Sequence, residues 1–319
     1  MREISFNEIE GFKLGHAKNE KAVTGCTVVI AKEGVTAGVD VRGGAPCTRE
    51  TDLLDPVNLV DVVHGVFISG GSAFGLDVAT GIMEYLEEKD IGFKAGLTKI
   101  PIVTGAVLYD LSIGDSKVRP DRKMGYEACV NSENEKEIYG NVGAGLGATV
   151  GKYKGSEFSM KGGLSTYAVQ VRDLKVGVVV AVNCMGDVVD PKTGTIIVGT
   201  LNDSKDGFVN SEELIISGYG ELENPFIMNT TIGIVVTNAK LTKAQAKKIA
   251  SMAQDGYART MRPSHTMFDG DTIFALGTGE IEVDVNLVGL LAARVVEEAV
   301  LRGVKEAEPI EGYKAYKNF

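Results

Sequence analysis

The sequence is poor in several residue types that common kinds of site require. It contains no tryptophan, three histidines and four cysteines, and no two cysteines form a C-x-x-C pair. Zinc sites and disulfide frameworks need closely spaced cysteines or histidines, so neither is indicated, and we expect no metal and no cofactor. With only His16, His64 and His265 present, a mechanism built on a histidine base has few candidates.

Basic residues and long apolar runs are also scarce. Lysine and arginine total 33 against 43 acidic residues, a formal net charge of −10, and no basic stripe with interleaved aromatics is present. This composition argues against a nucleic-acid partner. The longest apolar run, VGVVVAV at 176–182, is far shorter than the roughly 20 residues that a membrane span needs. The start of the chain lacks a basic-then-apolar leader pattern, so we expect a cytoplasmic protein without membrane contact.

Apolar residues make up 44% of the 319 residues, which is enough for a substantial core. We expect a single domain over residues 1–319. Strands that arrive in antiparallel-looking pairs, with helices grouped between them, predict a layered α+β protein rather than a regular βαβ repeat. The expected elements include a strand pair at 24–31 and 34–41, a short helix at 57–65, and a strand pair at 165–173 and 175–183.

The clearest helix follows Leu241. Thr242 and Gln245 form a capping box there, and Leu241 is placed to act as a hydrophobic staple. The apolar residues that follow recur on one face, so we expect this helix to pack on a sheet.

A glycine-rich loop, GNVGAGLGATVGK at 140–152, resembles nucleotide-binding loops only loosely. No apolar strand leads into it, and Tyr153 stands where a P-loop has serine or threonine, so we reject nucleotide binding. Two alternatives remain for Lys152. Either the small residues let the lysine reach inward, or the loop is a solvated turn with an exposed lysine.

The stretch NDSKDGFVNSEE, at 202–213, follows the spacing of an EF-hand calcium loop. Its first position is Asn202 rather than aspartate, and its flanks do not have helical patterns. We therefore favour a polar surface loop over a calcium site.

Several polar residues stand at positions where a site is often built. Tyr109 and Asn183 end predicted strands, where side chains emerge from a sheet, although turns are the commoner use. Asp269 and Asp271, in FDGDT, form either a simple D-G turn or a pair of carboxylates that polarises a neighbouring group. We interpret the nearby His265 as structural.

The stretch NPFIMNTTIGIVV, at 224–236, places two threonines at the mouth of a predicted strand, directly after Asn229. Threonine is ordinary strand material. Alternatively, a cut between Asn229 and Thr230 gives a new terminus whose α-amine, with an ordinary pKa of about 8, lies beside its own hydroxyl. Nucleophile and base then belong to one residue, and no histidine is needed.

Six stretches, in order and spacing, resemble the L-aminopeptidase/D-esterase family, which includes β-aminopeptidases and nylon-oligomer hydrolases. They are RGGAPCTRETDLLD, SGGSAFGLDVATGIMEYL, PIVTGAVLYDL, GNVGAGLGATVGK, NTTIGIVVTNAKLTKAQ and DGDTIFALGTG. The resemblance covers nearly the whole chain. It implies an αββα sandwich whose connectivity is shared with ornithine acetyltransferases, and a chain that cuts itself into 1–229 and 230–319.

Residue by residue, the resemblance assigns Thr230 as the nucleophile and Asn229 as the residue before the cut. It implies that the Asn183 amide stabilises an oxyanion, with Tyr109 near the acyl oxygen and Lys152 near the nucleophile. Asp269 and Asp271 match an acidic pair that holds the network around the new terminus.

This chain also departs from the family pattern. Classical aminopeptidase members cut before serine and carry Ser and Glu where Asp269 and Asp271 stand here, and the Asn-Thr cut with its lysine and two aspartates is more similar to the nylon-oligomer branch. Cys47 stands where glycine is expected.

The resulting prediction is a self-processed amide and ester hydrolase, first of all an aminopeptidase for small peptides, amides or esters, assembled as a tetramer. The alternatives are an endo-acting hydrolase of linear amide oligomers, an acyltransferase resembling ornithine acetyltransferase, and an unprocessed binding protein.

Overall fold

The computed structural model describes residues 1–134, 137–218 and 229–319, so the start of the 224–236 stretch lies outside the described residues. Its centre is a sheet of ten strands in two halves that share one long strand, β3 (Thr24–Val41). The first half has the order β1 (Arg2–Ile4), β11 (Gly163–Val171), β12 (Leu174–Val182), β15 (Ile232–Ala239), β17 (Thr272–Ile281) and the end of β3. The second half joins the start of β3 to β2 (Lys13–Asn19) and β5 (Val63–Ser69), and continues to β8 (Val103–Val107) and β4 (Thr48–Arg49).

The two halves of the sheet pack face to face. Val179 and Ala181 of β12 lie in the same buried cluster as Val66 and Ile68 of β5. Successive side chains of a strand point to opposite faces, so the intervening residues, such as Val180, lie in a different cluster. A valine-rich strand such as β12 is therefore buried on both faces.

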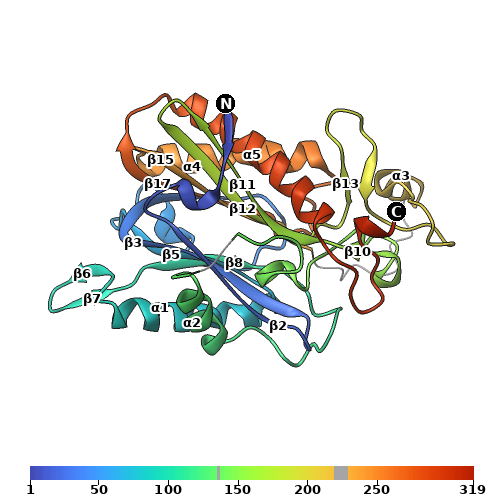
Figure 1. Ribbon diagram of the computed structural model, residues 1–319, viewed down its shortest axis with the longest axis horizontal. Coiled ribbons are helices and arrows are strands. Elements are labelled where there is room, and N and C mark those ends of the chain that lie inside the picture. The colour runs from blue at the N-terminus through green and yellow to red at the C-terminus, as the bar shows by residue number, and fades with distance from the viewer. Residues whose placement is uncertain (135–136, 219–228) are drawn as a thin grey trace.

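Helices cover the two outer faces. α4 (Lys243–Thr260) and α5 (Val285–Lys305) pack on the first half, and α1 (Val78–Glu88) and α2 (Arg122–Asn131) pack on the second half. Figure 1 shows these pairs above and below the strands. The order helix, sheet, sheet, helix confirms the predicted αββα sandwich. Among the described residues, no helix is long and apolar enough to cross a membrane.

Smaller elements complete the fold. They are α3 (Ser211–Ser217), the hairpins β6 (Phe93–Ala95) with β7 (Thr98–Ile100) and β9 (Thr149–Val150) with β10 (Met160–Lys161), and a sheet of β13 (Asp187–Val189), β14 (Ile196–Val198) and β16 (Met261–Arg262).

The predicted strand pair at 24–31 and 34–41 is wrong, because both segments belong to the one strand β3. Gly34 adopts a left-handed conformation, with φ of 74°, but it produces a bend with a register shift rather than a hairpin. The two ends of β3 then pair with different neighbours, which is how one strand connects both halves of the sheet.

The short helix predicted at 57–65 is also wrong. Residues 57–62 are irregular and β5 begins at Val63. The Lys243 ammonium of α4 donates hydrogen bonds to the carbonyls of Leu53, Asn58 and Val60. A lysine from a distant part of the chain therefore donates hydrogen bonds to carbonyls that would accept backbone N–H groups in a local helix.

The other two predictions of elements are confirmed. β11 and β12 pair as antiparallel neighbours, and β12 ends directly before Asn183. α4 begins with the expected capping box of Thr242 and Gln245.

Candidate active site

Three chain segments bring most of the predicted site residues to one end of the sheet. Ala181 near the end of β12 pairs with Ile232 at the start of β15, and Ile232 pairs in turn with Thr272 at the start of β17. Residues immediately outside these strand ends are therefore neighbours. They are Asn183 after β12, Asn229, Thr230 and Thr231 before β15, and Asp269, Gly270 and Asp271 before β17.

Thr230 is buried and its hydroxyl lies against the carbonyl of the preceding residue. The Oγ1 hydroxyl donates a hydrogen bond to the Asn229 carbonyl oxygen. The same oxygen accepts a hydrogen bond of 2.7 Å from the Gly270 N–H. The scissile carbonyl of the predicted cut thus has a backbone donor on its oxygen and a hydroxyl beside it.

Asn183 joins the predicted nucleophile to the predicted lysine. Its carbonyl oxygen accepts from the Thr230 N–H at 3.0 Å and from Lys152 Nζ at 3.1 Å. Its side-chain Oδ1 accepts from Lys152 Nζ at 2.8 Å and from the Thr149 N–H at 2.9 Å. Of the two alternatives for Lys152, the inward one is confirmed, because this lysine is only 5% exposed.

Tyr109 reaches this network through its backbone, because its carbonyl accepts a hydrogen bond of 3.1 Å from Asn183 Nδ2. One N–H of that amide is thereby occupied. The role of Asn183 as an oxyanion donor and the role of the Tyr109 hydroxyl both stay predictions.

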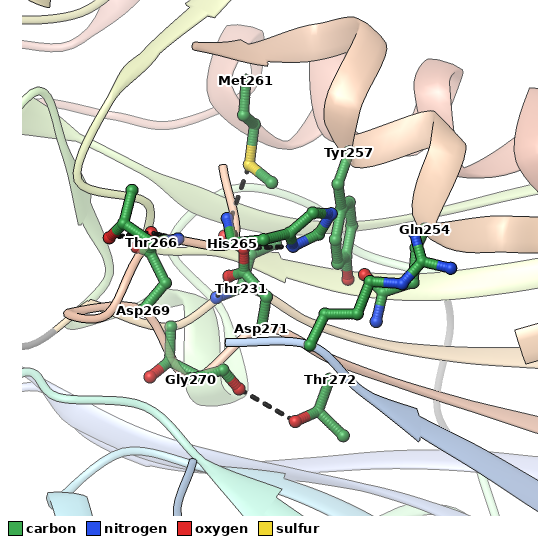
Figure 2. Close-up of polar contacts among 12 residues, drawn as sticks. Thr231, Gln254, Tyr257, Met261, His265, Thr266, Asp269, Gly270, Asp271 and Thr272 are labelled. Atoms are coloured by element: carbon green, nitrogen blue, oxygen red, sulfur yellow. Dashed lines mark hydrogen bonds and ion pairs between the residues drawn. The ribbon is translucent and has the colours of Figure 1, made fainter. Parts of the chain in front are cut away.

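The two aspartates form a buried pair on either side of Gly270 (Figure 2). Asp269 Oδ2 accepts from the N–H and the hydroxyl of Thr266, whereas its Oδ1 is buried and accepts no hydrogen bond from the described residues. Asp271 Oδ1 accepts from the Thr231 N–H at 2.9 Å, so it fixes the backbone next to Thr230.

His265 is a structural partner of this pair. Its backbone N–H and its ring Nδ1 both lie 3.0 Å from Asp271 Oδ2, and Figure 2 shows the ring beside Asp271. His265 adopts a left-handed backbone conformation here, with φ of 60°.

Burial shifts the pKa values of two groups in the site toward 7. It lowers the pKa of the Lys152 ammonium to about 7, although the nearby acidic groups favour the charged form. Burial and, to a smaller extent, the charge of Asp271 raise the pKa of the Asp269 carboxyl to about 6. The hydrogen bonds from Thr266 act in the opposite direction and lower this pKa. Groups with such pKa values exchange protons near pH 7, as an acid or base in catalysis must.

Sequence reasoning missed the part played by the loop 42–45. The N–H groups of Arg42 and Gly43 donate to the Asp271 carbonyl, and the Ala45 N–H donates to the Asp269 carbonyl at 2.8 Å. A Cβ on Gly43 would lie 2.2 Å from that Asp269 oxygen. The RGGA motif was visible, but no local pattern indicates which distant loop its backbone holds.

A second buried lysine, Lys161, was also missed. Its ammonium donates to the carbonyls of Gly145, Leu146 and Ala148, and burial lowers its pKa to about 7. The glycine-rich loop is therefore folded around Lys161 and leads directly to Thr149, which contacts Asn183.

The 202–213 stretch has the contacts of a polar surface loop. Asn202 pairs with Asp206, and Asp203 pairs with Lys154. Asn210 caps the short helix α3. Within residues 1–134, 137–218 and 229–319, no group of three or more His, Cys, Asp or Glu side chains is arranged to hold a metal ion.

Comparison with known proteins identifies the family of the chain. A model of peptidase family S58 matches residues 5–318. A protein named as an uncharacterised aminopeptidase of Mycobacterium leprae (strain TN) is 40% identical, over 98% of this chain and 93% of its own. A 6-aminohexanoate-oligomer endohydrolase of Paenarthrobacter ureafaciens is 28% identical, over 95% of this chain and 87% of its own.

Solved structures support the same fold. A β-aminopeptidase of Burkholderia sp. superimposes with a TM-score of 0.70 at 19% identity, covering 98% of this chain and 90% of its own. The L-aminopeptidase D-Ala-esterase/amidase of Ochrobactrum anthropi, described as a variant of the Ntn hydrolase fold, gives 0.69 at 17% identity, covering 98% and 89%. The chain therefore belongs to peptidase family S58 and is a hydrolase of peptide or amide bonds.

Proposed function

We propose that the chain cuts itself between Asn229 and Thr230 and then acts as an aminopeptidase whose nucleophile is the new N-terminal threonine. The observation that carries this proposal is the contact of Thr230 Oγ1 with the Asn229 carbonyl, whose oxygen also accepts the Gly270 N–H at 2.7 Å. A hydroxyl beside a polarised carbonyl is the arrangement that an acyl shift needs.

The cut proceeds in two steps. Thr230 Oγ1 bonds to the Asn229 carbonyl carbon, the peptide C–N bond breaks, and the hydroxyl proton is transferred to the Thr230 nitrogen. Water then hydrolyses the ester, which leaves a carboxylate on Asn229 and a free hydroxyl and amine on Thr230. Gly270 N–H stabilises the developing oxyanion.

Lys152 is the group we propose for moving the proton. Lys152 Nζ and the Thr230 N–H both contact the Asn183 carbonyl, so the lysine lies on the side of the nitrogen that must be protonated. With a pKa of about 7, Lys152 is partly neutral near pH 7 and is able to accept and return a proton.

In the processed enzyme, Thr230 attacks a substrate amide or ester and its own amine accepts the hydroxyl proton. We propose that Asp269, whose Oδ1 is buried without a hydrogen-bond donor among the described residues, holds this amine. Asp271 keeps the backbone at Thr231 in place. Asn183 and Tyr109 complete the oxyanion site, where losing one donor typically costs about 10²–10³-fold in turnover.

The test is the mass spectrum of the intact purified protein. Processing predicts two fragments, residues 1–229 and 230–319. A Thr230→Ala variant should remain one chain, while Thr230→Ser, which keeps the hydroxyl, should still be cut. A single full-length chain that hydrolyses amides would contradict the proposal, as would a junction at another position.

A second candidate substrate class is linear amide oligomers, as in the endohydrolase relative with 28% identity. The Asn-Thr cut and the two aspartates favour it. An acyltransferase activity would differ from both, because its product would form only when an acceptor amine is present. We also propose that the processed protomers form a tetramer in the cytoplasm.

A further inference from the structure

We propose that the backbone of Phe268 and Gly270, which binds Asn229 in the uncut chain, becomes the subsite for the acyl residue of the substrate, and that this subsite selects α-aminoacyl amides and esters. The inference rests on the proposed function. It names the substrate class that the same site prefers.

The uncut chain shows how this subsite binds a residue. Asn229 pairs with Asp269 as a single parallel β-bridge. The Asn229 N–H donates to the Phe268 carbonyl at 3.0 Å, and the Gly270 N–H donates to the Asn229 carbonyl at 2.7 Å. One donor and one acceptor of the loop therefore hold the backbone N–H and the backbone carbonyl of one residue.

Self-cleavage and substrate hydrolysis share an intermediate. In the first, Thr230 Oγ1 becomes esterified with the acyl group of Asn229 as the C–N bond breaks and the nitrogen gains the proton. In the second, the same oxygen is esterified with the substrate's acyl group, and the leaving amine gains the proton. The substrate carbonyl must therefore occupy the position of the Asn229 carbonyl, with its oxygen on the Gly270 N–H.

Neighbouring atoms restrict where the substrate carbonyl can lie. A Cβ on Gly270 would lie 2.5 Å from Thr230 Oγ1 and 2.9 Å from the Ala45 carbonyl oxygen, and Asn229 is 1% exposed. The Ala45 N–H holds the Asp269 carbonyl at 2.8 Å, which fixes the loop from outside. The carbonyl position is thus set before a substrate arrives, as preorganised catalysis requires.

The spacing of the two hydrogen bonds determines the substrate class. In Asn229 a single Cα separates the N–H from the carbonyl. An α-amino group on that carbon reaches the Phe268 carbonyl while the acyl oxygen stays on Gly270. A β-aminoacyl group inserts one methylene and a 6-aminohexanoyl group inserts four, so the amine no longer lies opposite Phe268 when the carbonyl is in place.

The test compares unbranched p-nitroanilides that share one leaving group, measured with the wild-type processed protein. The acyl groups are glycyl, β-alanyl and 6-aminohexanoyl, with acetyl p-nitroanilide as the analogue of the glycyl compound that lacks the amine. We expect kcat/KM for glycyl to exceed each of the others by about tenfold or more, the usual effect of one charge-assisted hydrogen bond.

Equal or higher kcat/KM for β-alanyl or 6-aminohexanoyl would overturn the subsite while leaving the threonine mechanism intact. Equal kcat/KM for the glycyl and acetyl compounds would likewise show that the Phe268 carbonyl does not bind the substrate amine. If processed protein with a verified Thr230 terminus hydrolyses none of the four, the proposed function fails, and the subsite fails with it.

Discussion

At the scale of single residues, Gly270 lies against both residues of the predicted cut. Its N–H contacts the carbonyl that Thr230 is proposed to attack, and its missing Cβ leaves room for the Thr230 hydroxyl. A glycine is needed here for close approach rather than for an unusual backbone conformation.

Replacing Gly270 with alanine should therefore slow self-cleavage by about 10²-fold or more, the usual cost of a lost oxyanion donor. The added methyl would lie 2.5 Å from Thr230 Oγ1, so either the hydroxyl or the donor must move. The fraction of full-length chain over time, on a denaturing gel, measures the effect.

Gly207→Ala is the matched control. An added Cβ there meets only Asn202 Nδ2, at 3.1 Å on a surface loop, and this variant should be cut like wild type. Normal cleavage of Gly270→Ala would show that the small size of residue 270 does not matter.

At the scale of elements, the glycine-rich loop depends on a lysine from the neighbouring strand β10. The Lys161 ammonium donates to three carbonyls of the loop; those of Gly145 and Ala148 also accept a backbone N–H, so Lys161 matters most for the Leu146 carbonyl. Buried carbonyls without donors are costly, so this one side chain determines how the loop is held.

Lys161→Met should lower the free energy of unfolding by about 1–3 kcal/mol, because the Leu146 carbonyl loses its donor, while the Gly145 and Ala148 carbonyls keep the N–H groups of Ala148 and Gly162. The background is Thr230→Ala, which we expect to keep the chain whole. The pKa of Lys161 is about 7 in the folded state and about 10.4 when unfolded. Between these values the unfolded state binds more protons, so the stability that Lys161 contributes rises with pH.

The loss caused by Lys161→Met should accordingly be larger at pH 9 than at pH 6 in urea denaturation. Lys154→Met removes an ion pair with Asp203, whose side chain is 91% exposed, and should cost well under 1 kcal/mol at either pH. A pH-independent loss for Lys161→Met would contradict the shifted pKa.

At the scale of the whole molecule, the predicted cut does not divide the protein into two bodies. β15 and β17 belong to the 230–319 piece, yet they lie between β12 and β3 of the 1–229 piece in one continuous sheet (Figure 1). Helices α4 and α5 of the smaller piece also cover the face of that sheet.

The two fragments should therefore stay together after cleavage. In gel filtration under native conditions we expect one peak that contains both, at the elution volume of the uncut Thr230→Ala chain. They should separate only in denaturant. A 230–319 fragment that elutes alone would show that the shared sheet does not hold the pieces together.

Much of the site was predictable from sequence because its chemistry is local. The Asn229-Thr230 pair, the D-G-D motif and Asn183 at the end of a valine-rich strand are each short patterns with a chemical reason. The strand pair β11 and β12 and the capped helix α4 also follow from nearby residues alone.

The long strand β3 and the irregular segment 57–62 show where local patterns fail. We predicted a strand pair at 24–31 and 34–41, but the start of β3 pairs with β2 and β5 and its end pairs with β17, so the chain continues as one strand. We predicted a short helix at 57–65, but Lys243 from far along the chain binds the carbonyls of Asn58 and Val60 instead.

The sequence by itself determined the family, the layered architecture and the residues that we propose for the chemistry, because these depend on side-chain type and short-range order. Only the tertiary structure decided that Gly270 donates to the Asn229 carbonyl, that loop 42–45 holds the aspartates, and that Lys161 supports the glycine loop. Each of these contacts involves a backbone carbonyl, a group that every residue possesses. Their pairing depends on which distant segments the fold brings together.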